Sequence, residues 1–423
     1  MEQILVSQNP HWQNKRYPNL LPRAILPSLL AKLSLKEVHI LLGIRRAGKS
    51  TIFKLLINEL LSIAEPKSIV YVNLDDPNYA ELGPDAKLLY RILDTAEKIT
   101  GHKPQYLFLD EIQNVTAWER FIKSVYDNEI LKKIFITGSN SFLLKSAYAK
   151  LITGRYTHNT IYPLSFEEIL HASQINSLID LYEQKAKVIK LLENFLYYGS
   201  FPEIIKITTD ELKHDMLTNY YEGVVLKDCI ANHNIRDIKT LQELSIYLMT
   251  NTAALYSYNS LAKNLHSNEN TIKEFVHILE DAFLLTEIKN FSYSLTSQAR
   301  GKKKTYCIDN GLLHAVSLAF SKNLGKLFEN LVFSELQKSN ENTLYFFNDL
   351  KECDFIVKNR NHMIAIQACY ELTTDNKPRE IAGLLNAMKK LTIADGVIIT
   401  FNQEETINDN IKVIPFWRYF CGW

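Results

Sequence analysis

The chain has 423 residues, of which 46% are hydrophobic and 22% charged, and this composition excludes a disordered or low-complexity protein. Lysine and arginine total 48 and aspartate and glutamate 47, so any surface that binds nucleic acid has to be local. No run approaches the roughly 18 apolar residues of a membrane span, Met1–Trp12 lacks the apolar core of a signal peptide, and the five cysteines show neither disulfide nor CxxC spacing. We therefore expect a cytoplasmic protein of several domains that does not contact membranes.

A glycine-rich loop follows the first predicted strand. Residues 38–42 form a short apolar run, and helical spacing begins at Ile52. Residues 43–51 between them read GIRRAGKST, which matches G-x-x-x-x-G-K-[ST] in its required setting of strand and helix. In such a loop backbone N–H groups surround phosphates, the lysine reaches the β- and γ-phosphates, and the serine binds Mg²⁺. We predict that ATP is bound by Gly43, Arg46, Ala47, Gly48, Lys49, Ser50 and Thr51, with Ser50 also a ligand of Mg²⁺. The side chains of Arg45 and Arg46 point outward from such a loop, which favours their contact with another domain.

Acidic residues follow the next two predicted strands. Residues 69–74 are followed by Asp75 and Asp76. Their carboxylates either approach the metal or cap the loop, and capping is the favoured role. Residues 106–109 are continuously apolar, as in a central parallel strand, and Asp110 and Glu111 follow them. Asp110 is placed to hold Mg²⁺ directly or through water, and Glu111 to orient or deprotonate an attacking water. Together with the glycine-rich loop, this pair predicts binding of ATP or GTP.

Small polar residues and one arginine follow the strand predicted over residues 133–137. Ser139, with Asn140 as the alternative, is placed to sense the γ-phosphate at the end of this strand, and a plain turn is equally compatible. Arg155 comes just beyond, in a chain with only 12 arginines against 36 lysines. Its guanidinium either neutralises charge on the γ-phosphate, in the same subunit or a neighbouring one, or forms a surface salt bridge. Action on a neighbour would require a homo-oligomer.

These motifs closely resemble those of a prokaryotic family of AAA-type ATPases whose members carry a C-terminal domain of unknown function, DUF4143. The likeness spans nearly the whole chain and rests on residues 9–12, 43–51, 109–113, 137–141, 153–155, 162–168 and 199–203. The resemblance implies an α/β fold with a P-loop NTPase core, in which helices cover both faces of a parallel sheet. It also implies a helical lid, a winged helix and a nuclease-like domain. The expected boundaries are 1–165 for the ATPase core, 166–236 for the lid, 237–315 for the winged helix and 316–423 for the nuclease-like domain.

Two helices and a basic segment mark the expected winged helix. The helical patterns of residues 257–265 and 271–279 are separated by a short turn, as in a helix-turn-helix, and strand-like residues 284–288 and 304–308 follow. The densest basic cluster of the chain lies between these strands and consists of Arg300, Lys302, Lys303 and Lys304. In a DNA-binding protein this wing would grip phosphates, although the acidic second helix matches DNA poorly. Packing between domains is the alternative role of the module.

The C-terminal residues resemble the core of PD-(D/E)xK nucleases, in which an Asp and an E-x-K motif on neighbouring strands hold a divalent metal. Glu329 and Asp354 match the acidic positions, whereas Gln367 and Cys369 stand where the second carboxylate and the lysine belong. Glu371 is displaced from the pattern. Glutamine binds a hard cation weakly and neutral cysteine cannot replace an ammonium, so we expect an inactive nuclease fold kept for binding or assembly.

The sequence thus predicts a Mg²⁺-dependent ATPase whose nucleotide cycle moves the winged-helix and nuclease-like domains on DNA or on a partner protein. One alternative is a DNA endonuclease gated by ATP. The other is a slow ATP-dependent switch, in which bound nucleotide orders a surface for a partner protein.

Overall fold

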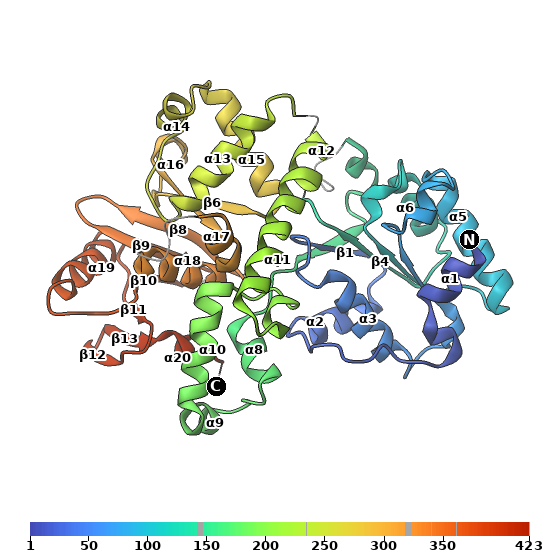
Figure 1. The fold of residues 1–423 in the computed structure, drawn as a ribbon, viewed down its shortest axis with the longest axis horizontal. Coiled ribbons are helices and arrows are strands. Elements are labelled where there is room, and N and C mark those ends of the chain that lie inside the picture. The colour runs from blue at the N-terminus through green and yellow to red at the C-terminus, as the bar shows by residue number, and fades with distance from the viewer. Residues whose placement is uncertain (142–146, 234, 318–322, 340, 361, 423) are drawn as a thin grey trace. The chain divides into compact units, whose positions relative to one another are not determined.

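The chain folds into two compact units, Met1–Tyr162 and Pro163–Trp423 (Figure 1). The computed structural model describes residues 1–141, 147–233, 235–317, 323–339, 341–360 and 362–422. The division at 162/163 lies close to the boundary expected at 165/166, and the three modules expected beyond it form a single compact unit. Within the described ranges, none of the helices has both the length and the apolarity to cross a bilayer.

A five-stranded sheet organises the first unit. Its strands are β1 (Val38–Leu42), β2 (Ile69–Asn73), β3 (Tyr106–Asp110), β4 (Lys133–Gly138) and β5 (Tyr156–Thr160). They lie in the order β2-β3-β4-β1-β5, and every neighbouring pair is parallel. Every residue of β1 and β4 is buried, as continuous apolar runs covered on both faces require. This topology confirms the predicted α/β class of P-loop NTPases.

Helices precede and connect these strands and bury apolar side chains. They are α1 (Glu2–Gln8), α2 (Leu26–Ala31), α3 (Lys49–Leu60), α4 (Pro77–Ala80), α5 (Ala86–Thr100) and α6 (Trp118–Asp127). Phe53 of α3 packs edge-on against Phe108 of β3, with ring centroids 5.2 Å apart. Phe108 in turn stacks on Phe135 of β4 at 5.0 Å. This aromatic cluster fixes α3, and with it the loop that precedes α3, on the central strands.

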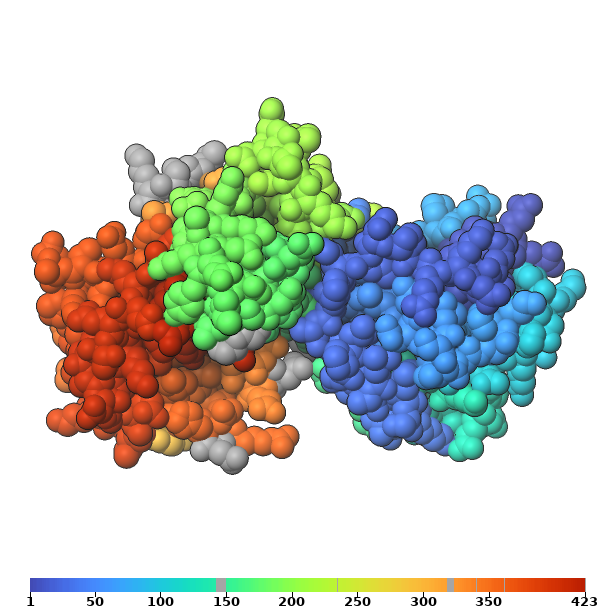
Figure 2. All heavy atoms as spheres, turned by 90° about the horizontal axis from the view of Figure 1, so that it is seen from below, coloured from blue at the N-terminus to red at the C-terminus, as the bar shows by residue number. Residues whose placement is uncertain are grey.

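The amino-terminal segment covers the free edge of β2. The amide of Asn9 donates to the Tyr71 carbonyl at 2.9 Å and accepts from the Tyr71 N–H at 2.7 Å, as a neighbouring strand would. Trp12 donates its indole N–H to the Ile69 carbonyl at 2.7 Å. In Figure 2 this segment appears as dark blue atoms on the surface of the first unit. Its side chains therefore satisfy an edge strand that would otherwise be open to pairing with other chains.

The second unit begins with helices. They are α8 (Phe166–Ala172), α9 (Leu178–Glu183), α10 (Lys185–Tyr198), α11 (Asp210–Gly223), the π-helical segment η7 (Val224–Ile230), α12 (Ala231–His233) and α13 (Ile238–Thr250). The next elements are α14 (Tyr258–Asn264), α15 (Glu269–Asp281), β6 (Leu285–Lys289), α16 (Leu295–Arg300), β7 (Lys303–Cys307) and α17 (Asn310–Val316). Strands β6 and β7 pair antiparallel after the two helices. This is the element order that a winged helix requires, and the assignment stays a prediction.

A mixed six-stranded sheet ends the chain. Helix α18 (Leu324–Leu336) precedes β8 (Thr343–Asn348), β9 (Glu352–Lys358) and β10 (Met363–Cys369). The remaining elements are α19 (Lys377–Leu391), β11 (Gly396–Thr400), β12 (Glu405–Asn408), β13 (Ile411–Pro415) and α20 (Phe416–Tyr419). The strand order is β12-β13-β11-β10-β9-β8, with antiparallel pairing from β8 to β10 and parallel pairing from β10 through β11 to β13.

A buried polar network joins the three expected modules of the second unit. The side chain of Asn330 on α18 is fully buried; it donates to the Cys307 carbonyl at 3.0 Å and accepts from the Cys307 N–H at 2.8 Å. It also accepts from the Thr252 hydroxyl at 2.9 Å and donates to the Asn310 side chain at 2.8 Å. Asn310 reaches the Leu196 carbonyl on α10 at 2.9 Å. Such a network stabilises only one packing of its elements, because any other would leave polar groups unpaired in the interior.

Candidate functional site

The glycine-rich loop lies at the carboxyl edge of the parallel sheet, between β1 and α3. Gly43 has φ of +152°, and a Cβ there would come within 2.1 Å of the Ile161 carbonyl oxygen. Gly48 caps α3 with φ of +96°, a region that favours glycine. The Lys49 ammonium is buried and donates to the carbonyls of Gly43 at 2.8 Å and Ile44 at 3.1 Å. The loop therefore curves around this ammonium at the amino end of a twelve-residue helix.

The other predicted loop residues surround Lys49. Ala47 is buried, and Ser50 and Thr51 are half-buried in the first turn of α3. Arg46 has an exposed side chain and a backbone φ of 67°, in agreement with an outward-facing position. Residues 43–48 thus supply the backbone of the loop that curves around the Lys49 ammonium. The Arg46 side chain faces away from the interior.

Asp110 joins the acidic strand end to the glycine-rich loop. Its side chain is almost fully buried, and the side chain of Ser50 lies close enough to it to lower its pKa. Tyr71 donates its hydroxyl to Asp110 Oδ2 at 2.9 Å, and Thr137 donates to the other carboxylate oxygen. Burial raises the pKa of Asp110, and the hydroxyls of Ser50 and Thr137 oppose that rise. The structure therefore brings together the two motifs that the sequence places 60 residues apart.

Glu111 is held by its neighbours in an unusual backbone conformation. Its φ is 57°, in the left-handed region, which few non-glycine residues adopt. Its N–H donates to the Thr137 hydroxyl at 2.9 Å. The Gln113 amide donates both to the Glu111 carboxylate and, at 3.3 Å, to the Ser139 hydroxyl. Strained backbone of this kind clusters at functional sites, where the surrounding contacts enforce it.

The predicted sensing residues also lie at this edge. Ser139 and Asn140 follow β4 directly and are both buried. Ser139 contacts Gln113, so it belongs to the same hydrogen-bonded group as Glu111. Of the two earlier acids, Asp76 caps as predicted, and Asp75 accepts from the Asn114 side chain at 3.3 Å. Asp76 accepts from the Asn78 N–H at 3.1 Å at the start of α4.

Arg155 lies at the amino edge of the sheet, opposite the carboxyl edge that carries the glycine-rich loop. Its guanidinium forms a 2.8 Å ion pair with Asp127 at the end of α6, and this contact lowers the pKa of Asp127. Arg155 immediately precedes β5, whose register with β1 runs from Val38 opposite Tyr156 to Leu42 opposite Thr160. The length of the strand, roughly 3.3 Å per residue, separates Arg155 from the loop after Leu42. The prediction that Arg155 contacts phosphate in its own subunit is therefore wrong, and the salt-bridge alternative is what the structure contains. Action on a neighbouring subunit stays a prediction.

Three further residues contact the site and were not singled out from the sequence. Thr137 and Tyr71 bind Asp110, and the only signal for Thr137 is a hydroxyl at the end of an apolar strand. Arg23 is buried and donates to the carbonyls of Ala47 and Tyr162, both at 2.8 Å. It thereby ties the glycine-rich loop to the last residue of the first unit. Nothing local in the sequence around Arg23 marks this role, because both partners are distant backbone groups.

The basic wing is smaller than predicted. Arg300 and Lys302 are exposed, but Lys303 and Lys304 are buried within β7. Lys303 donates to the carbonyls of Ala299 at 3.1 Å and Gly301 at 2.9 Å. The expectation that all four cations face a nucleic acid is therefore wrong for Lys303 and Lys304. Both faces of β7 are covered, so neither of these neighbouring lysines reaches the surface.

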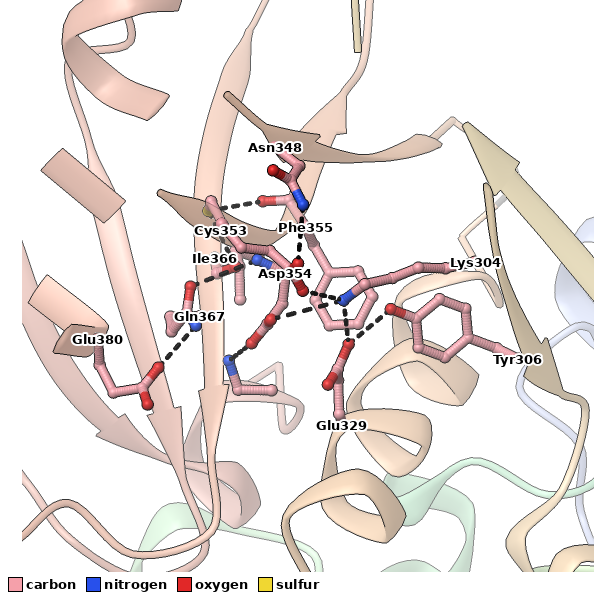
Figure 3. Close-up of polar contacts among 12 residues, drawn as sticks. Lys304, Tyr306, Glu329, Asn348, Cys353, Asp354, Phe355, Ile366, Gln367 and Glu380 are labelled. Carbon is pink, nitrogen blue, oxygen red and sulfur yellow. Dashed lines mark hydrogen bonds and ion pairs between the residues drawn. The ribbon is translucent and has the colours of Figure 1, made fainter. Parts of the chain in front are cut away.

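The C-terminal sheet and helices α18 and α19 border a cavity of about 810 Å³. Its wall includes Glu352 and four residues that Figure 3 labels, Glu329, Asp354, Gln367 and Glu380. Gln367 donates to Glu380 at 2.6 Å and accepts from the Asp354 N–H at 3.3 Å, so protein groups engage both ends of its amide.

Several of the predicted residues do not form a metal site. Burial raises the pKa of Cys369 to about 11, which keeps its thiol neutral, and Glu371 is exposed. Across the part of the chain that the structure describes, no group of three or more His, Cys, Asp or Glu residues is arranged to hold a metal ion. The residues present therefore do not fit the divalent metal of a PD-(D/E)xK nuclease.

Comparison with known proteins finds three matched regions along the chain. Residues 35–170 match an AAA domain, residues 189–323 a domain of unknown function (DUF8612), and residues 324–419 the domain of unknown function DUF4143. An uncharacterized protein of Methanocaldococcus jannaschii is 33% identical over 412 residues, which cover 92% of this chain and 89% of the relative. An uncharacterized protein of Haemophilus influenzae is 28% identical over 399 residues, covering 91% and 94%.

Among solved structures, AMPPCP-bound DnaA from Aquifex aeolicus is similar at 15% identity with a TM-score of 0.31, covering 64% of this chain and 92% of that one. At this score the likeness carries no argument about function. The resemblance predicted from the motifs is confirmed by the domain matches and by the archaeal relative. The chain belongs to the family of the M. jannaschii protein, with an AAA domain near its amino end and a DUF4143 domain near its carboxyl end.

Proposed function

We propose that this protein binds ATP with Mg²⁺ and hydrolyses it. The closeness of the Ser50 and Asp110 side chains carries the proposal, because it joins the glycine-rich loop to the acidic end of β3. Both side chains offer oxygen atoms, the ligands that Mg²⁺ prefers, so they fit this ion. When bound, Mg²⁺ would neutralise charge on the phosphates.

The remaining residues of the site divide the work between binding and hydrolysis. Backbone N–H groups of the loop and the Lys49 ammonium would hold the phosphates. Glu111 would orient or deprotonate the attacking water, and its contacts with Thr137 and Gln113 hold its backbone and its carboxylate in place. Ser139, which contacts Gln113, would respond to the γ-phosphate.

Phosphate release from ATP by the purified full chain tests this proposal. Lys49→Ala should abolish nucleotide binding, whereas Glu111→Gln should keep binding and lose turnover, because it removes only the group that acts on water. Glu129→Gln is the matched control, since Glu129 is exposed and pairs with Lys36 at 2.6 Å. Unchanged turnover in the folded double variant K49A/E111Q would refute the proposal.

The nucleotide cycle would act on the second unit as a single body. The network around Asn330 supports this, because the helical, hairpin and C-terminal elements share it. Motion of the second unit as one body is more restricted than independent motion of a winged helix and a nuclease-like domain. If Arg155 acts on the nucleotide at all, it does so in an assembly of subunits, and Arg155→Ala would then lower turnover only at protein concentrations where subunits associate.

A nucleic-acid partner is a second candidate, carried by the exposed cations Arg300 and Lys302 on the β6–β7 hairpin. Two cations give weak, salt-dependent affinity for phosphates. Turnover measured with duplex DNA, single-stranded DNA and RNA tests it. Stimulation by one polymer that the variant R300A/K302A loses would support DNA or RNA contact, and equal turnover with all polymers would favour a protein partner.

A further inference from the structure

Three carboxylates of the second unit converge on one ammonium (Figure 3). Lys304 projects from β7, Glu329 from α18, and Glu352 and Asp354 from β9. The distances from Lys304 Nζ are 2.7 Å to Glu352, 2.9 Å to Glu329 and 3.8 Å to Asp354. Tyr306, also on β7, donates its hydroxyl to Glu329 at 2.7 Å. The hairpin thus contributes both a cation and a hydrogen-bond donor to the acidic wall of the cavity.

Three members of the cluster are largely buried, so their charges depend on one another. The Lys304 side chain is 1% exposed, and those of Asp354 and Glu329 are 9% and 13% exposed, whereas the Glu352 side chain is 37% exposed. Burial alone would lower the pKa of Lys304, but attraction to Glu329, Asp354 and Glu352 overcomes it and raises that pKa. Burial and the nearby Glu329 raise the pKa of Asp354 well above its usual value, and Lys304 only partly offsets this. Among these groups, Lys304 is therefore the one that opposes the loss of charge at Asp354.

The acidic positions of a PD-(D/E)xK core would share a divalent metal, and here an ammonium touches them instead. Glu329 and Asp354 are the residues that match those positions in the sequence. We propose that Lys304 is the built-in cation of this site, standing where a divalent metal would bind and tying the β6–β7 hairpin to the C-terminal sheet. The proposal goes beyond ATP hydrolysis and does not depend on it, because no residue of the first unit takes part.

Removing the ammonium should turn the cluster into a metal site. Lys304→Met keeps most of the side-chain volume and leaves three carboxylates without a counter-ion. A divalent cation would then neutralise them, since Asp and Glu oxygens are its natural ligands. We expect K304M to bind one more Mn²⁺ ion per chain than the parent protein, and the double variant K304M/D354N to lose that ion.

The experiment titrates the full chain with Mn²⁺ alone and follows free Mn²⁺ by electron paramagnetic resonance. All proteins carry Ser50→Ala, so that the nucleotide site contributes equally. Lys302→Met is the matched control, because Lys302 is an exposed lysine on the same hairpin and should add no ion. A folded K304M protein that binds no additional Mn²⁺ would overturn the proposal, as would an additional ion that D354N does not remove.

A second comparison needs no change at Lys304 and therefore stands if K304M does not fold. If Lys304 fills the cation position, Asp354→Asn in the otherwise unchanged chain should leave Mn²⁺ binding as it was. Loss of a bound Mn²⁺ ion in D354N would show that the metal and Lys304 occupy the cluster together, which contradicts the proposal. Far-ultraviolet circular dichroism confirms that each variant compared is folded.

Discussion

Thr137→Val removes one hydroxyl from the proposed nucleotide site and keeps the shape of the side chain. In the wild-type protein that hydroxyl donates to the Asp110 carboxylate and accepts from the Glu111 N–H at 2.9 Å. Thr137 and Asp110 are 0% and 1% exposed, so bulk water does not replace the lost partner. A hydrogen bond to a charged group contributes roughly 1.5–3 kcal/mol. We therefore expect T137V to lower the free energy of unfolding by about 2 kcal/mol, measured by urea denaturation.

The same variant should change catalysis and its dependence on pH. Burial already raises the pKa of Asp110, and the Thr137 hydrogen bond is one of the contacts that lower it, so its loss raises the pKa further. A proton then competes with Mg²⁺ for Asp110 up to a higher pH. Because Thr137 also holds the Glu111 backbone, we expect kcat to fall about tenfold or more, the equivalent of roughly 1.4 kcal/mol. Phosphate release at saturating ATP and a series of pH values measures both effects.

Thr116→Val provides the control, because the exposed Thr116 hydroxyl binds only the Pro84 carbonyl at 3.1 Å among the described contacts. T116V should leave kcat and the acid limb of the pH profile unchanged. If T137V loses stability but keeps wild-type kcat and the wild-type acid limb, then the hydroxyl supports the fold alone. The inferred link from Thr137 through Asp110 and Glu111 to catalysis would then be refuted.

Three other changes test the fold around the two units. Asn330→Ala leaves the N–H and the carbonyl of Cys307 without the Asn330 side chain in the interior. We expect the free energy of unfolding of the second unit, measured in urea, to fall by about 3 kcal/mol. A fall of less than about 1 kcal/mol would show that the network is not needed for stability. Asn9→Ala frees the Tyr71 backbone on the edge of β2, and should cost about 2 kcal/mol and increase self-association in light scattering. Burial raises the pKa of Asp309 to about 6, so this acid binds its proton more tightly in the folded state than in the unfolded state. Its contribution to the free energy of unfolding is therefore present below pH 4 and is lost as the pH rises to 6. Asp309→Asn should remove that decline, which amounts to about 3 kcal/mol in urea unfolding compared at pH 4 and pH 7, and an unchanged decline would contradict the assignment.

The closeness of the glycine-rich loop and the acidic end of β3 was predictable because both motifs are local and the sheet is parallel. Residues 38–60 form a strand, a loop and a helix in succession, and the carboxyl ends of parallel strands share one edge. Asp110 therefore had to lie near the loop that leads to Ser50, because both lie at the carboxyl ends of strands in one sheet. Thr137 was missed because its hydrogen-bond partners, Asp110 and Glu111, end or follow a neighbouring strand. A single hydroxyl in an apolar run forms no periodic pattern that the sequence could reveal.

Arg155 and Lys304 show where such reasoning fails. Arg155 follows the sensing strand in sequence, but a residue that opens the next parallel strand lies at the other edge of the sheet. Lys304 belongs to a run of basic residues, and alternation along a strand predicts that one of two neighbours faces water. Both faces of β7 are buried, and the acids that accommodate Lys304 lie 25 to 50 residues further along the chain. Only the three-dimensional arrangement brings those charges together.

The two buried clusters of the second unit limit how nucleotide binding can affect it. Asn330 and Lys304 both link β7 or its neighbours to the C-terminal elements, one by neutral hydrogen bonds and the other by ion pairs. Breaking either would leave buried polar or charged groups unpaired, which costs more than displacing the unit as a whole. A conformational change that acts on the second unit therefore has to displace it as one body. Arg23 contacts both Ala47 in the glycine-rich loop and Tyr162 at the end of the first unit, so one buried side chain links that loop to the segment that leads into the second unit.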